Sequence, residues 1–161
     1  MNLRKLAIPS PLLIGLILSG MIVAGAVVCS FTISTSMTIS ATYGITVFDT
    51  DHSTVLSSLG FGEFHRGDSR RFPSAGTYFI DSEEGSLWLS YTLTDWPAGV
   101  TLEIFIRKNG GSYEALTPGK KTSFSIDEAA FAEWYSIVTV TDSAAFGSYS
   151  PKIVWAGNDS A

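Results

Sequence analysis

The clearest pattern of hydrophobic and polar positions in this chain lies between residues 31 and 39. The stretch alternates almost perfectly, with the apolar Phe31, Ile33, Met37 and Ile39 on one side and Thr32, Ser34, Ser36 and Thr38 on the other. A period of two with one apolar side is typical of a half-buried β-strand. The apolar stripe therefore predicts burial, either in the chain's own domain or in a neighbouring molecule.

Further alternating segments follow at short intervals, each bounded by turn residues. They run from Tyr43 to Val47, Leu87 to Tyr91, Val100 to Ile106, Thr122 to Ile126, Ser136 to Thr141 and Lys152 to Ala156. The pair Asn109-Gly110 after the third of them indicates a hairpin, because both residues tolerate positive φ. This spacing predicts an all-β fold, a single two-sheet β-sandwich of the jelly-roll or Ig-like kind. One stretch differs: helix formers after an acidic start predict a short helix or helical turn from Asp127 to Trp134, crossing between the two sheets.

The uncharged run from Leu12 to Cys29 follows the basic residues Arg4 and Lys5. This layout is typical of a hydrophobic N-terminal helix that serves as a signal peptide or a single-span anchor. The small residues Ala24-Gly25-Ala26 favour cleavage after Ala26 over retention. In either case we expect the rest of the chain to cross the cytoplasmic membrane and to work at the cell surface or outside the cell.

These patterns predict four parts of the chain. Residues 1–26 form the signal peptide or membrane anchor, and residues 27–41 form an extended N-terminal strand. Residues 42–157 form the sandwich domain, and residues 158–161 form a loose tail. No repeat or second composition regime suggests another domain.

Composition narrows the classes of partner. Beyond residue 48 the chain carries eight basic and fifteen acidic residues, a net charge of −7. An acidic surface repels phosphates, so we expect no nucleic-acid partner.

Cys29 is the single cysteine, which excludes an intrachain disulfide. Lipid modification of Cys29 would call for a small residue before it, and Val28 stands there, so we favour a plain apolar cysteine.

The sequence offers little for catalysis or metal binding. The two histidines, His52 and His65, have no partner at ligand spacing, and there is no His-Glu-x-x-His, cysteine pair or Gly-x-Ser-x-Gly elbow. We therefore expect no enzyme activity, no cofactor, no metal and no small-molecule substrate. Carboxylates gather at Asp49 and Asp51 and again at Asp81, Glu83 and Glu84. Loop oxygens of this kind can hold calcium, but solvated turns are the favoured interpretation.

Two surface features remain. Arg66, Arg70 and Arg71 form a basic patch beside Asp68, which is either solvated surface or a docking place for an acidic neighbour. Asn158-Asp159-Ser160 is an Asn-x-Ser sequon, which makes Asn158 a candidate glycosylation site.

Two short motifs and the N-terminal layout carry a family resemblance. They are Leu59-Gly60-Phe61-Gly62-Glu63-Phe64-His65-Arg66-Gly67-Asp68-Ser69 and Leu116-Thr117-Pro118-Gly119-Lys120, with Trp96-Pro97 as a further match. From about Ile33 to Trp155 the chain resembles the camelysin and TasA-type matrix fibre proteins and the related archaeal bundling pilins. Phe61 stands where that family usually has tryptophan, and Arg66-Gly67 stands where it usually has Pro-Gly. The helical stretch around Phe131 departs from the family pattern.

The resemblance implies a structural subunit of an extracellular filament, a pilus or biofilm matrix fibre, that assembles head-to-tail by donor-strand exchange. Its partner would be further copies of itself, and membrane contact would be confined to export. The implied donor strand presents Phe31, Ile33, Met37 and Ile39 to the neighbour, with Ser34 and Ser36 facing outward.

Three alternatives stay open. A monomeric membrane-anchored binding module would keep its hydrophobic segment and fold the alternating strand into its own sheet. An enzyme is suggested only because some camelysin relatives carry a peptidase label. A helical-core pilin would need cleavage near Ala7, and Pro9 and Pro11 speak against the continuous helix that this requires.

Overall fold

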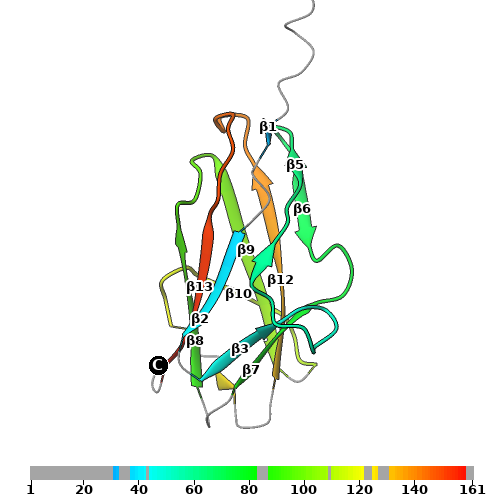
Figure 1. Cartoon of the computed structure of the whole chain (residues 1–161), viewed down its shortest axis with the longest axis vertical. Helices are drawn as coiled ribbons and strands as arrows, with labels where there is room; N and C mark the ends of the chain where they lie inside the picture. The colour runs from blue at the N-terminus through cyan, green and yellow to red at the C-terminus, as the bar shows by residue number, and fades with distance from the viewer. Residues whose placement is uncertain are drawn as a thin grey trace, which may run out of the picture. The chain divides into compact units, whose positions relative to one another are not determined.

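The computed structural model describes residues 31–32, 37–42, 44–82, 87–108, 110–121, 125–126 and 131–158. Every regular element within these ranges is a β-strand, and none is a helix (Figure 1). The prediction of an all-β domain is confirmed for this part of the chain. The predicted signal peptide or anchor, residues 1–26 with its hydrophobic helix, lies outside the described residues.

One main sheet has six strands. Its order is β10 (Glu114–Leu116), β9 (Val100–Lys108), β12 (Phe131–Val140), β7 (Tyr78–Ser82) and β3 (Ile45–Phe48), and β6 (Ser69–Phe72) also pairs with β12. All of these pairings are antiparallel. β6 and β7 pair with successive parts of the same strand, β12, so they follow one another along it.

The other main sheet has five strands. Its order is β11 (Ser125–Ile126), β8 (Leu87–Thr94), β13 (Lys152–Asn158), β2 (Met37–Thr42) and β4 (Ser58–Leu59). β2 runs parallel to β13, and it is the one parallel pairing among the described strands. A separate two-stranded piece joins β1 (Phe31–Thr32) to β5 (Glu63–Phe64). The first long strand of the domain therefore lies beside the last (Figure 1).

Alternation along the strands builds one hydrophobic core from both main sheets. In β12 the buried positions are Ala132, Trp134, Ser136, Val138 and Val140, and the residues between them are half-buried. Trp134 of the six-stranded sheet meets Trp155 of the five-stranded sheet edge to face, with ring centroids 5.2 Å apart. This arrangement of two sheets around one core is consistent with a β-sandwich.

The predicted helix from Asp127 to Trp134 is wrong for its second half. Residues 131–134 open β12, where Phe131 pairs with Asp81 and Trp134 with Tyr78. The helix prediction rested on the propensities of Ala129, Ala130 and Ala132, which are weak compared with tertiary packing. Placing Trp134 in the core requires the period of two that the rest of the strand follows. Residues 127–130 lie outside the described part.

The other predicted strands are confirmed to within a few residues, as β3, β8, β9, β12 and β13. β9 and β10 are antiparallel, as a hairpin requires, and Gly110 in their connection has φ +75°. Of the predicted strand from Thr122 to Ile126, the structure describes Ser125–Ile126 as β11. β13 reaches Asn158, so the sheet extends one residue into the predicted tail. Residues 159–161 lie outside the described part.

The passage from β2 to β3 changes sheets within two residues. β2 belongs to the five-stranded sheet and β3 is the last strand of the six-stranded one. Gly44, which immediately precedes β3, has φ +67°, a conformation that costs a residue with a Cβ atom about 1–2 kcal/mol. Glycine at this position lets the chain leave one sheet and enter the other abruptly.

Candidate functional site

The predicted donor residues fall into three groups in the structure. Met37 and Ile39 lie in β2 and are 0% and 6% exposed, so their own chain buries them. Phe31 lies in β1, paired with Phe64 of β5. Ile33, Ser34 and Ser36 lie outside the described residues. The stripe is therefore split between β1 and β2, and the described part of it that reaches the core is in β2.

β2 is held on its two sides by unequal partners. On one side it pairs with β13 over five residues, from Thr38 opposite Lys152 to Thr42 opposite Ala156. On the other side it pairs with β4 over two residues, Met37 opposite Leu59 and Thr38 opposite Ser58. The side that faces away from β13 is thus covered only over the first half of the strand.

The segment Asp49–Leu59, which we call the strap, provides this cover. It begins where β3 ends in the six-stranded sheet and finishes as β4 in the five-stranded sheet. Near β3, the amide of Asp49 donates to Thr54 O at 2.8 Å and the amide of Leu56 donates to Val47 O at 2.8 Å. Near β2, the amide of Ile39 donates to Ser57 O at 2.9 Å. The strap therefore satisfies backbone groups on the outer strands of both sheets, which would otherwise be open edges.

The strap contributes two side chains to the core and leaves another exposed. Leu56 and Leu59 are 8% and 5% exposed and belong to the core, whereas Val55 is 62% exposed. An open pocket of about 230 Å³ lies between β2, β3 and the strap, lined chiefly by Ile39, Ala41, Ile45, Val47, Val55 and Leu56. At Val55 the strap is attached through its backbone bonds to β3.

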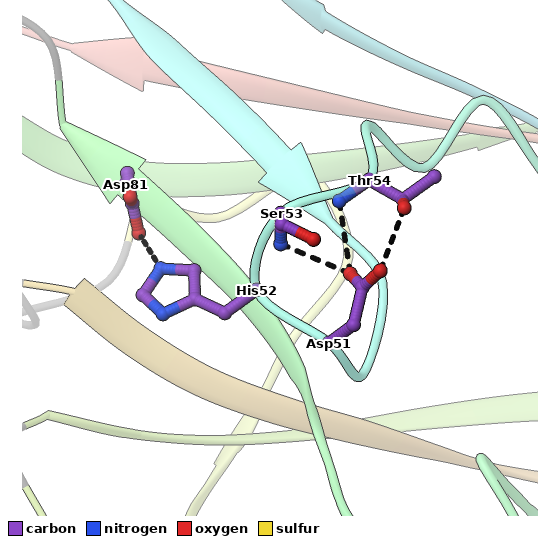
Figure 2. Close-up of polar contacts among 5 residues, drawn as sticks. All are labelled: Asp51, His52, Ser53, Thr54 and Asp81. Carbon is purple, nitrogen blue, oxygen red and sulfur yellow. Dashed lines mark hydrogen bonds and ion pairs between the residues drawn. The ribbon is translucent and has the colours of Figure 1, made fainter.

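A polar turn shapes the start of the strap (Figure 2). The carboxylate of Asp51 accepts hydrogen bonds from the Thr54 hydroxyl at 2.7 Å and from the amides of Thr54 and Ser53, both at 2.9 Å. These three donors, led by the hydroxyl, hold the pKa of the Asp51 carboxyl well below its usual range. Figure 2 shows that the neighbouring side chain, His52, leaves the turn in the opposite direction.

His52 connects this turn to the six-stranded sheet. Its Nε2 lies 2.7 Å from Asp81 Oδ1 (Figure 2), and its ring stacks on Phe79 with centroids 4.2 Å apart and planes 8° apart. Phe48 and Phe131 approach the same ring edge-on, at 5.6 Å and 5.1 Å. Its backbone φ is +52°, a value that is uncommon outside glycine and that asparagine, aspartate and histidine adopt more often than other residues. His52 therefore sits within an aromatic group on strands β3, β7 and β12.

Sequence reasoning missed this arrangement. His52 and Asp81 are 29 residues apart, and the sheet brings them together by placing β3 beside β7. The available signal was the alternation around Asp81: Tyr78 and Ile80 point into the core, so Phe79 and Asp81 share the outer face.

The carboxylates of the two predicted clusters do not come together as one site. Asp81 serves as a partner of His52. Asp49 and Asp51 belong to the strap, and Glu83 and Glu84 lie outside the described residues. Across the described ranges, no three His, Cys, Asp or Glu residues gather in a way that could hold a metal ion.

The three arginines of the predicted basic patch each lie over an aromatic ring. The guanidinium of Arg66 is 4.2 Å from the ring of Phe146, that of Arg70 is 4.7 Å from Phe64, and that of Arg71 is 4.3 Å from Tyr135. Each also has a polar partner within its own chain: Arg66 donates to Ala144 O, Arg70 to Asp68, and Arg71 to Pro73 O. The patch is therefore organised by local contacts.

Asn158, the candidate glycosylation site, is the last residue of β13. Its Nδ2 donates to Trp88 O and to Ser90 Oγ, both at 3.1 Å, and to Ala156 O at 3.3 Å. This nitrogen is the atom that would carry a glycan. The modification, which stays a prediction, would therefore require the side chain to give up these bonds.

Two further results bear on function. Within the described part of the chain, no helix is long and apolar enough to cross a membrane. Comparison of the chain with protein-family models, with curated proteins and with solved structures finds no match. The functional argument therefore rests on the residues and the geometry themselves.

Proposed function

We propose that this protein is a structural subunit of an extracellular filament, a pilus or biofilm matrix fibre, and that it assembles head-to-tail by donor-strand exchange. The observation that supports the proposal is the position of β2. It is the first long strand of the described chain, and it supplies the core residues Met37 and Ile39 to a sheet that also contains the strand nearest the C-terminus. The resemblance to camelysin and TasA-type proteins, and a jelly-roll-like sandwich as the detailed topology, are parts of this proposal.

Exchange of β2 between copies conserves its interactions. Removing β2 opens one edge of β13 and takes two core side chains away, each worth about 1.5–3 kcal/mol of burial. The β2 of a second copy has the same sequence, so it restores the same backbone pairs and fills the same positions. The surface that gives the strand differs from the one that receives it, so the contact repeats into an open filament.

The connection after β2 suits such an exchange. Only residues 43–44 separate β2 from β3, and Gly44 holds the positive φ that the turn between sheets needs. Short connections that must turn sharply favour domain swapping, because extending the hinge relieves the constraint. Opening at this point would leave β3 and all later strands in place.

A monomeric membrane-anchored binding module is the second candidate. The burial of Met37 and Ile39 in their own chain favours it. The two candidates differ at the N-terminus of the mature protein. A start near Val27 frees the strand, whereas an intact hydrophobic segment ties it to the membrane.

Cysteine cross-linking between β2 and β4 tests the proposal. Ile39 N donates to Ser57 O, the residue directly opposite, so the adjacent pair Thr38 and Ser58 is a non-hydrogen-bonded pair, the kind of antiparallel pair with the shorter Cα separation. This geometry is compatible with a disulfide. In a Cys29→Ser background, we would mix one tagged population carrying Thr38→Cys with a differently tagged one carrying Ser58→Cys.

Donor-strand exchange predicts disulfides between the two tags, with filaments visible by electron microscopy of the purified surface material. The matched control places Thr94→Cys and Lys152→Cys in separate populations, because these residues face each other on β8 and β13, which stay together. Absence of intertag disulfides, together with an internal disulfide in the Thr38→Cys/Ser58→Cys double variant, would leave the monomeric module. N-terminal sequencing of the same material decides whether the hydrophobic segment is removed.

A further inference from the structure

We propose that the strap controls the release of β2 from its own sheet, and that the contact of His52 with Asp81 and Phe79 holds the strap in place. The inference deepens the donor-strand proposal, and its meaning for assembly rests on that proposal. The effect on β2 itself is measurable in a single chain.

The sheet order makes the strap an obstacle to exchange. β2 lies between β13 and β4, so an incoming strand cannot replace it from the edge while β4 is in place. To free that side, three contacts of the strap have to break: the bond from Ile39 N to Ser57 O and the pairs of β4 with Met37 and Thr38. Once the strap has moved, β2 is an edge strand, and an edge strand is open to displacement by another strand.

The strap is attached at both ends and beside β3. At one end, Leu59 is buried opposite Met37. At the other end, His52 joins the strap to β7. Between them Leu56 is buried and its amide donates to a carbonyl of β3, whereas the Val55 side chain is largely exposed. Loss of the His52 attachment should therefore loosen the first half of the strap.

His52 ties the strap to the part of the molecule that would stay behind. Its ring partners Phe48, Phe79 and Phe131 come from β3, β7 and β12, and its carboxylate partner Asp81 comes from β7. None of these strands belongs to the exchanging segment. His52 is therefore a positioning residue for β2: its ring and carboxylate partners lie on β3, β7 and β12, and it acts on β2 through the strap.

The first experiment locks the strap to β3 without touching β2. Phe48 and Val55 form an isolated bridge, and the bonds from Asp49 N to Thr54 O and from Leu56 N to Val47 O mark them as a non-hydrogen-bonded pair. Phe48→Cys/Val55→Cys in the Cys29→Ser chain is therefore expected to form a disulfide. We expect the oxidised protein to release β2 several-fold more slowly than the same protein after reduction, so the reduced form is its own control. Release is measured by hydrogen exchange of β2 amides relative to those of β12.

The second experiment loosens the strap. His52→Asn keeps a residue that tolerates positive φ but removes the ring and its contacts with Asp81 and Phe79. We expect hydrogen exchange in β2 to rise about two- to tenfold. The matched control is His65→Asn, because His65 is exposed and lies outside the strap. β12 should exchange at the same rate in both variants.

The outcomes separate this inference from the proposed function. Equal β2 exchange in the locked and reduced proteins, or in the His52→Asn and His65→Asn variants, overturns the strap inference even if intertag disulfides form. Slowed β2 exchange in the locked protein supports the inference even if no variant ever forms an intertag disulfide. In that case the filament proposal fails and the strap remains a device that governs the stability of β2 within one chain.

Discussion

Two chain segments connect the outer strands of the two main sheets, one on each side, and they differ in their interactions. On one side the strap passes from β3 to β4, with a stacked ring, a carboxylate pair and the Asp51 turn. On the other side the chain passes from β10 to β11. There the amide of Gly119 donates to Tyr91 O of β8 at 2.7 Å. The Tyr91 hydroxyl adds a bond to Leu116 O at 3.2 Å.

The difference between the two connections corresponds to how extensively the strands beside them pair with the inner strands. β8 and β9, next to β11 and β10, pair with internal partners over seven and nine residues. β2 has five parallel pairs on its inner side and depends on the strap on its outer side. We conclude that the strap, the connection with the ring stack and the carboxylate contact, lies beside β2, the strand with fewer pairs to its inner neighbour. The comparison also indicates where the fold opens first, since local opening starts where few bonds must break.

The largest expected effect comes from the buried end of the strap. Leu59→Ala should lower the free energy of unfolding by about 2–5 kcal/mol, because it leaves a cavity opposite Met37. Leu116→Ala, at a half-buried position on the other side, should cost about 1 kcal/mol. Urea denaturation measures both. Equal losses would contradict the claim that the strap is the better anchored of the two connections.

The next effect concerns the hinges. Gly44→Ala and Gly119→Ala both place a Cβ at positive φ, +67° and +73°, and should each cost about 1–2 kcal/mol of folding stability. Only Gly44→Ala should also speed hydrogen exchange in β2, because its strain disappears when the link to β3 opens. If the two variants change β2 equally, the hinge between β2 and β3 has no special role.

A smaller effect isolates the His52–Asp81 pair. Both side chains are about one-third exposed, so a double-mutant cycle with His52→Asn and Asp81→Asn should give a coupling free energy of about 0.2–1 kcal/mol. A coupling that is zero would leave the ring stack on Phe79 as the main contribution of His52.

The smallest effect is a pH dependence at Asp51. Its carboxyl has a lowered pKa in the folded chain, so its hydrogen bonds stabilise the fold above the ordinary carboxyl pKa of 3.8, and this contribution is lost as the pH falls toward the lowered value. Asp51→Asn should therefore be less stable than the parent at pH 7, and the gap should shrink below pH about 4. Denaturation midpoints across this range provide the measurement, with the exposed Glu114→Gln as the control on the other side.

Sequence patterns located several strands, did not predict others such as β6, β7 and β10, and were insufficient for the site. Alternation located β3, β8, β9 and β13 because each has one buried face. It failed at Phe131–Trp134, where three alanines within four positions suggested a helix and the burial of Trp134 in the sheet decided otherwise. The burial of Met37 and Ile39 followed from their spacing, but the identity of their partner did not, since a period of two says nothing about which strand lies alongside. His52 and Asp81 meet only because β3 and β7 are neighbours, and no local signal encodes that pairing.

The parallel pairing of β2 with β13 has a consequence for the order of events during biosynthesis. A chain that is translocated from its N-terminus delivers β2 first and β13 last, so β2 waits unpaired until synthesis and transport are nearly complete. Contacts between the two ends of a chain also form slowly, because the long intervening loop must close first. Each chain translocated in this way would pass through a period in which β2 and the slot beside β13 are both vacant. If the proposed export holds, crowding of such chains would set how many β2 strands pair with another molecule before they pair with their own.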